Sequence, residues 1–134
     1  MISPKVLLVS AADHDRAYLE ELQSLLSTHV PLTCVREGKP LERLLEGGCY
    51  DALFYLRPAG REDWKEPLRK IRARLPDLPV IVLSETEMIG EFAEVLQSGA
   101  FDFLLPPYAS HTLLAAVTQA VASTEGRARH AVRG

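Results

Sequence analysis

The stretch GAFDFLLPPY at residues 99–108 follows closely on the apolar run LPVIVLSE at residues 78–85. Short apolar runs bounded by turn residues are typical of buried strands, so we expect a strand in each stretch, at 80–83 and 101–104. Between them, a helical pattern from about 86 to 98 ends at a glycine, a residue that commonly closes helices. Two strands separated by a helix predict neighbouring parallel strands joined by a crossover.

The rest of the chain repeats this alternation of apolar strands and amphipathic helices. The pattern predicts further strands at 5–10, 32–36 and 52–56, and helices at 13–28, around 41–45, at 62–75 and from 110 to 124. This succession indicates an α/β protein with a doubly wound, five-stranded parallel sheet in a single domain. It fits the strand order 2-1-3-4-5 of flavodoxin-like sheets, and any site is then expected at the carboxyl ends of the first and third strands.

Length and charge limit the classes of protein that fit. The chain has 134 residues, 47% of them hydrophobic, and a formal net charge of −3. This length suits one domain, which we expect to span 1–124, followed by a basic linker or disordered tail at 125–134. The slight negative charge disfavours direct nucleic-acid binding, because phosphate contacts need clustered Lys and Arg side chains. Residues 57–74 are rich in Lys and Arg, which favours a solvated face or, alternatively, a surface for an acidic partner.

Cofactor-binding and catalytic motifs are not found. Cys34 and Cys49 have no metal-ligand spacing and are interpreted as free thiols. The segment SAADHD at 10–15 lacks the glycines of a phosphate-binding loop, and no nucleophile elbow is present. We therefore predict no metal, no cofactor and no enzymatic activity. Without a signal peptide or a long apolar span, we expect no membrane partner and a reducing, cytoplasmic location.

The closing motif resembles that of response-regulator receiver domains. In receivers, Gly-Ala-x-x-aromatic-x-x precedes Lys-Pro-aromatic, and here the matching positions include Gly99, Phe103 and Tyr108. The pair Tyr50 and Asp51, at the start of the third predicted strand, matches a second landmark of the family. The resemblance covers roughly residues 4–122 and implies a receiver-like domain of two-component or phosphorelay signalling.

The same resemblance identifies the positions of the phosphorylation pocket, and most of them have lost their chemistry. Receivers use an acidic pair to hold a divalent cation, an aspartate to attack phosphorus, a hydroxyl and a lysine. The acidic pair corresponds to Ser10 and Ala11, the aspartate to Leu56 and the lysine to Pro106. Only Ser84, at the hydroxyl position, matches the family. The chain is therefore predicted to be a pseudo-receiver that lacks the phosphoacceptor aspartate.

Three functional hypotheses follow from this altered pocket. The first is a phosphorylation-independent interaction module that regulates an attached or partner output domain, with a transcriptional output domain as one option. The second is a small-ligand sensor with a depression lined by Ser10, Leu56 and Ser84. The third and weakest is a receiver phosphorylated at an unusual acid, Asp13 or Asp15, although acids in the first turn of a helix are also expected for capping and dipole reasons.

The last predicted helix indicates where such a module would meet its partners. Residues 111–124 contain no Asp, Glu, Lys or Arg, and two apolar stripes run along the helix. Helical spacing predicts a core stripe of Leu113, Ala116, Val117 and Ala120. In receivers, the face formed by the fourth helix, the fifth strand and the fifth helix serves dimerisation, so we expect a homodimer through this face. Its predicted residues are Glu91, Glu94, Phe103, Leu114, Thr118 and Val121.

Overall fold

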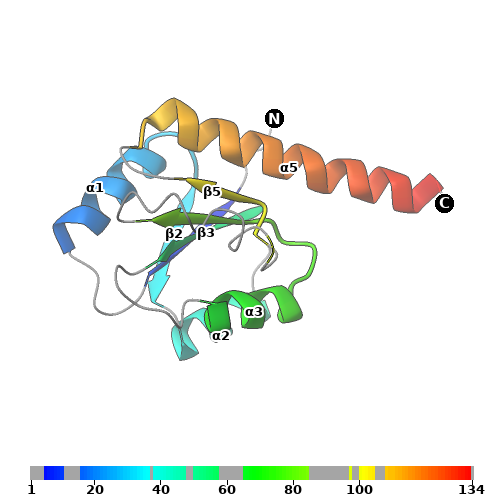
Figure 1. Ribbon diagram of the computed structural model, residues 1–134, viewed down its shortest axis with the longest axis horizontal. Coiled ribbons are helices and arrows are strands. Elements are labelled where there is room, and N and C mark those ends of the chain that lie inside the picture. Colours follow the sequence, from blue (N-terminus) through cyan, green and yellow to red (C-terminus); the bar gives the residue numbers. More distant parts are fainter. Residues whose placement is uncertain are drawn as a thin grey trace.

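The computed structural model describes residues 5–10, 16–36, 38–47, 50–57, 65–84, 97, 100–104 and 108–133. Its centre is one sheet of five parallel strands in the order β2-β1-β3-β4-β5 (Figure 1). The strands are β1 Val6–Ser10, β2 Leu32–Arg36, β3 Ala52–Arg57, β4 Val80–Ser84 and β5 Asp102–Leu104. The predicted fold class and strand order are therefore confirmed.

Helices cover both faces of this sheet (Figure 1). The described helices are α1 Arg16–Ser27, α2 Lys39–Gly47, α3 Lys65–Arg74 and α5 Ser110–Arg133. Helices α1 and α5 pack on one face, whereas α2 and α3 pack on the other. The predicted helix at 86–98 lies outside the described residues except for Gln97, which is helical. None of the described helices combines the length and the apolar character needed to cross a bilayer.

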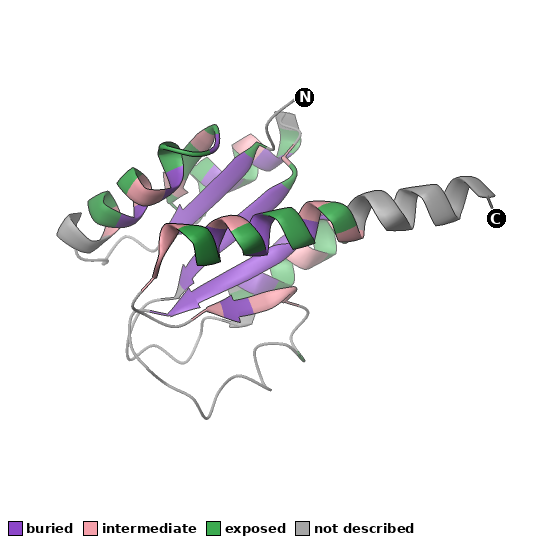
Figure 2. Cartoon of the chain, turned by 90° about the horizontal axis from the view of Figure 1, so that it is seen from above, coloured by how far each residue is buried: buried purple, intermediate pink, exposed green. Residues whose placement is uncertain are grey.

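The alternation of side chains along each strand divides the core into two layers. On β1, Val6 and Leu8 point toward α1 and α5, whereas Leu7 and Val9 point toward α2 and α3. Every residue of β1 and β4 is buried (Figure 2). Strands that are buried on both faces need continuous apolar runs, and this explains why these two strands were readable from the sequence.

The last helix is longer than predicted. Its backbone is helical to Arg133, beyond the expected helix end at Thr124. The reason is that this segment is rich in Ala and Arg, which favour helix, and contains no proline. The single glycine, Gly126, costs only about 1 kcal/mol relative to alanine in a helix. That the segment serves as a linker stays a prediction.

Candidate functional site

The carboxyl edge of the sheet brings together three residues that the sequence assigned to the altered pocket. Ser10 ends β1 and is the register partner of Leu56 on β3. Ser84 ends β4 and pairs with Arg57, the residue after Leu56. The pocket positions on these three neighbouring strands therefore lie at the same edge of the sheet, as expected for the ends of parallel strands.

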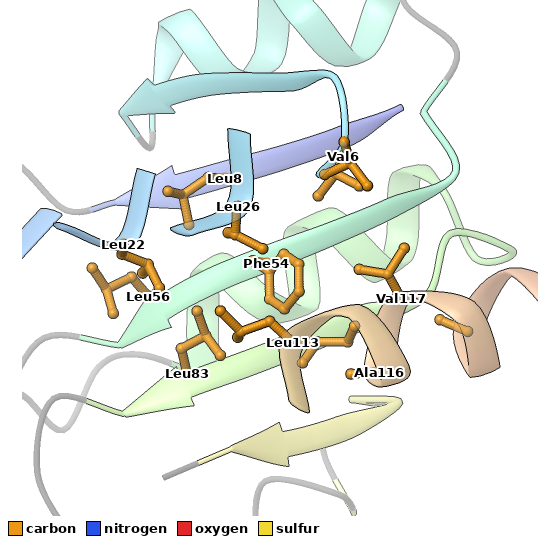
Figure 3. Close-up of a cluster of buried hydrophobic side chains, with 13 residues drawn as sticks. Val6, Leu8, Leu22, Leu26, Phe54, Leu56, Leu83, Leu113, Ala116 and Val117 are labelled. Atoms are coloured by element: carbon orange, nitrogen blue, oxygen red, sulfur yellow. The ribbon is translucent and has the colours of Figure 1, made fainter. Parts of the chain in front are cut away.

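Leu56, which the sequence resemblance assigns to the phosphoacceptor position, belongs to the hydrophobic core. Its relative exposure is 0%, and it lies in the cluster between the sheet and helices α1 and α5 (Figure 3). Leu22, Leu26 and Leu83 belong to the same cluster. A buried hydrocarbon side chain offers no oxygen that could attack phosphorus. Leu56 therefore contributes to core packing and not to phosphoryl transfer.

The two serines of this edge are also buried, but they do not share one side of the sheet. Ser10 is 5% exposed and Ser84 is 3% exposed. Leu83 packs with Leu56 in the α1 and α5 layer, so strand alternation turns the next residue, Ser84, toward the α2 and α3 side. The side chains of Leu56 and Ser84 therefore point to opposite faces, which is unfavourable for a single depression lined by both.

Other positions of the predicted pocket fall outside the described residues. These are Ala11 and Pro106, together with the alternative acids Asp13 and Asp15. Within the part of the chain that the structure describes, no group of three or more His, Cys, Asp or Glu side chains could hold a metal ion.

The predicted core stripe of α5 is confirmed. Its four residues are all buried: Leu113, Ala116, Val117 and Ala120 have relative exposures of 0%, 3%, 1% and 0%. On the neighbouring stripe, Leu114 and Val121 are half-buried and Thr118 is exposed. The Thr118 hydroxyl donates to the carbonyl of Leu114 over 2.9 Å, which satisfies it within the helix. A partly exposed stripe therefore remains on this side of α5, in which the two apolar side chains also pack against the core.

The remaining residues of the predicted interaction face are two glutamates and Phe103, and the structure describes only Phe103. Glu91 and Glu94 lie outside the described residues. Phe103 is only 3% exposed and packs in the layer beneath α2 and α3. Its ring is thus a core element in this structure, and its role in an interaction face stays a prediction.

One contact at this edge was not foreseen from the sequence. The Tyr108 hydroxyl donates a hydrogen bond to the backbone carbonyl of Ser84. In the sequence, Tyr108 counted only as the aromatic residue of the closing motif. A tyrosine at that position could have given a signal, because a partly buried tyrosine hydroxyl usually has a hydrogen-bond partner.

The fold and this edge define a class, that of receiver-like domains with a flavodoxin-type sheet. No protein-family model matches the chain. It is similar to the response regulator MprA of Mycobacterium leprae, with 31% identity over 110 residues, which are 81% of this chain and 48% of that protein. MprA of Mycobacterium ulcerans is similar at 31% identity over 115 residues, 85% of this chain and 48% of that protein. The chain spans about half the length of the curated relatives it matches.

Solved structures support the same fold. The signal receiver domain of an HD domain-containing protein from Pseudomonas fluorescens Pf-5 aligns with a TM-score of 0.74 and 24% identity, over 92% of this chain and 98% of that one. NtrX from Brucella abortus aligns with a TM-score of 0.82 and 17% identity, over 99% of this chain and 30% of that one. The sequence relatives thus support a response-regulator receiver domain, and the structural neighbours support its fold.

Proposed function

We propose that this chain is a phosphorylation-independent receiver-like module that signals through protein contacts and regulates an attached or partner output domain. The observation that carries the proposal is Leu56, a fully buried leucine at the position of the phosphoacceptor. The relatives are response regulators, which supports a signalling role. The altered pocket supports control by a partner or by expression in place of phosphate.

The chemistry of aspartyl phosphorylation explains why the altered pocket matters. Divalent cations such as Mg²⁺ are bound through carboxylate oxygens, and the charge that develops on phosphorus is stabilised by the cation and a nearby positive side chain. The described strand ends that correspond to this site carry Ser10, Leu56 and Ser84, none of which has a carboxylate. A weaker cation site and a missing nucleophile both favour the absence of phosphate chemistry.

The α5 surface supports the second part of the proposal, a homodimer through the predicted fourth helix, β5 and α5. Leu114 and Val121 are half-buried on the second stripe of α5. Leu104 on the edge strand β5 is half-buried too, as is Phe101, directly before that strand. Partly exposed apolar side chains that gather on one side of a domain favour association. A second copy of the chain is the partner we propose for this side.

The phosphate part of the proposal is tested by titration with magnesium and beryllofluoride, which mimics an acyl phosphate. Binding is followed by calorimetry and by the melting temperature, and the receiver domain of a related MprA protein serves as the positive control. We expect no heat of binding and no change in melting temperature for this chain. A saturable, magnesium-dependent response would overturn the proposal. If Asp13→Asn or Asp15→Asn abolished such a response, phosphorylation at an unusual acid would take its place.

The dimer is tested separately by sedimentation velocity at micromolar concentrations. Thr118→Arg places a charge on the exposed second stripe of α5, and Gln119→Arg places the same charge on a different side of that helix. We expect the wild type and Gln119→Arg to dimerise and Thr118→Arg to be monomeric. A monomeric wild type, or equal dimerisation of both variants, would contradict a dimer through this stripe.

A further inference from the structure

Helix α3 concentrates positive charge in a chain that is negative overall. Five of its ten residues are Lys or Arg, and its sequence contains one acid, Glu66. The whole chain has 15 Lys and Arg against 18 Asp and Glu, which gives a formal net charge of −3. Positive side chains are therefore gathered on this helix and not spread evenly along the chain.

The packing of α3 turns part of this charge toward the solvent. Leu68 and Ile71 are 0% and 1% exposed and hold the helix on the sheet, on the face that α2 also covers (Figure 1). Arg69 and Lys70 lie between these two core residues in the sequence, and both are exposed. Helical spacing places them on the side of α3 that faces away from the sheet. The core thus holds the backbone from which both cations project.

The two arginines in the last turn of α3 are accounted for within the chain. Arg74 forms an ion pair with Glu46 of α2 over 2.8 Å. The Arg72 guanidinium donates to the carbonyl of Leu78. The last turn of a helix also favours positive charge because of the helix dipole. These two arginines therefore need no partner from outside the chain.

Arg69 and Lys70, in the middle of the helix, have no such explanation. Within the part of the chain that the structure describes, neither of them forms an ion pair, although Glu66 lies four residues before Lys70. Lys70 and Arg74 are also four residues apart, a spacing at which like charges destabilise a helix. The two exposed cations therefore add repulsion to the fold, and the carboxylates of a bound partner would relieve it.

We propose that the exposed side of α3 around Arg69 and Lys70 is a docking surface for an acidic segment of a partner protein. Carboxylates complement this surface, because they form charge-assisted hydrogen bonds with guanidinium and ammonium groups. A nucleic acid fits it less well. Double-stranded DNA carries one charge per about 1.7 Å of its axis, and two unpaired cations on a chain of net charge −3 offer it few phosphate contacts.

This surface does not overlap the one proposed for the homodimer. Helix α3 packs in the core layer on one face of the sheet, whereas α5 packs in the layer on the other face. The inference rests on the proposed function and deepens it, because it gives the chemistry of a protein partner for a module that signals through protein contacts.

Fluorescence anisotropy tests the proposal with labelled poly-L-glutamate as the probe. Arg69→Gln combined with Lys70→Gln removes both charges and keeps good helix formers. We expect this double variant to bind the probe about fivefold more weakly than the wild type, the effect of losing two exposed charge pairs. Lys5→Gln combined with Arg36→Gln is the matched control, because it removes two exposed charges beside β1 and on β2. The control should bind like the wild type.

Four outcomes would overturn the proposal. The first is a wild type that does not bind poly-L-glutamate. The second is equal weakening in the double variant and the control, which would show that net charge alone decides binding. The third is tighter binding of a single-stranded oligonucleotide than of poly-L-glutamate, which would assign the surface to nucleic acid. The fourth is loss of self-association in the double variant, measured by sedimentation velocity, which would assign the surface to a second copy.

The melting temperature separates a docking role from a structural one. Because Arg69 and Lys70 form no ion pair within the described residues, the double variant should melt at the temperature of the wild type or above it. A lower melting temperature would show that the two side chains stabilise the fold, and it would contradict the proposal. A response to beryllofluoride would overturn the phosphate part of the proposed function and leave the α3 result standing, so the two failures are distinguishable.

Discussion

Lys5 and Asp51 are joined by two hydrogen bonds at the amino end of the sheet. The Lys5 amide donates to the Asp51 carboxylate over 2.7 Å, and the Asp51 amide donates to the Lys5 carbonyl over 2.8 Å. The pair lies directly before β1 and β3, at the end opposite Leu56. Asp51 is an acid close in the sequence to Leu56, but its hydrogen bonds join the amino ends of β1 and β3.

Asp51→Ala is expected to lower the free energy of unfolding by about 1.5–3 kcal/mol, the usual contribution of a hydrogen bond to a charged group. The site is exposed, so the effect stays at the lower end of this range. Urea denaturation measures it, with Asp51→Asn as the control that keeps an oxygen acceptor for the Lys5 amide. Equal midpoints for the wild type and Asp51→Ala would show that the carboxylate bond does not stabilise the fold.

Leu56→Asp introduces the acid that receivers carry, and we expect a less stable protein without phosphate chemistry. Leu56 is 0% exposed, and an unpaired carboxylate in that cluster costs several kcal/mol because it loses its hydration. We expect a loss of about 3–5 kcal/mol in the free energy of unfolding. Acetyl phosphate should leave the mass of the variant unchanged, and incorporation of phosphate would contradict our account of the pocket.

The pH dependence of this variant separates a buried charge from lost packing. Burial raises the pKa of the introduced carboxyl above its unfolded value, because desolvation disfavours the charged form. The folded state then binds more protons than the unfolded state between the two values, so stability falls as the pH rises through that window. Leu56→Ala leaves a cavity and no charge. Its deficit of about 2–5 kcal/mol should stay constant with pH, whereas that of Leu56→Asp should shrink on acidification.

Periodic burial made most of the fold readable from the sequence. The buried strand β4 begins at the predicted residue, Val80, and the core stripe of α5 was predicted residue by residue. Both depend on local spacing, which the sequence carries directly. The extension of α5 to Arg133 was missed because a glycine and several arginines resemble a linker. Helix propensity alone would have favoured continuation.

The pocket was only partly predictable. The predicted strand order put Ser10 and Leu56 near the carboxyl ends of neighbouring strands, and the register pairs them, although β3 continues one residue further, to Arg57. The bond from Tyr108 to Ser84 could not be read in the same way. It joins a side chain to a backbone carbonyl 24 residues away, and only the packed structure determines which carbonyl a hydroxyl reaches. A sequence shows that a tyrosine needs a partner, but not which one.

Cys34 is expected to react slowly with alkylating reagents, although it lies exposed on the edge strand β2. Partial desolvation raises the pKa of its thiol, while a hydrogen bond with the Gln23 side chain acts in the opposite direction. Less thiolate is therefore present at neutral pH, and the thiolate is the reactive form. The rate of alkylation by iodoacetamide is measured across pH in a Cys49→Ser background. The pH at which this rate reaches half its maximum should be higher than for an unfolded cysteine peptide.

Gln23→Leu provides the matched test, because it keeps the volume and the desolvation but removes the hydrogen bond. The pKa of Cys34 should rise further, and alkylation at a given pH should slow. The folded state favours the neutral thiol, so this contribution to stability is complete below the unfolded pKa and is lost as the pH rises through the folded value. Faster alkylation in Gln23→Leu would show that access to the thiol, and not its pKa, limits the reaction.

The ion pair between Arg74 and Glu46 should contribute little to stability. Its atoms are 2.8 Å apart, but the two side chains are 43% and 63% exposed. Exposed pairs contribute about 0.2–1 kcal/mol, so a double-mutant cycle with Arg74→Ala and Glu46→Ala should give a coupling in that range. Salt at about 1 M shortens the screening length to about 3 Å and should bring the coupling close to zero.

Arg72 lies on the same helix as Arg74, but its partner is a neutral backbone carbonyl and not a carboxylate. Its guanidinium donates to the carbonyl of Leu78 over 3.3 Å in a partly buried position, and this bond joins the end of α3 to the start of β4. Arg72→Met keeps most of the apolar stem and should cost about 1 kcal/mol. Because a carbonyl carries no net charge, the loss should change little with salt. A strong salt dependence for Arg72→Met would mean that Arg72 acts through neighbouring charges and not through this bond.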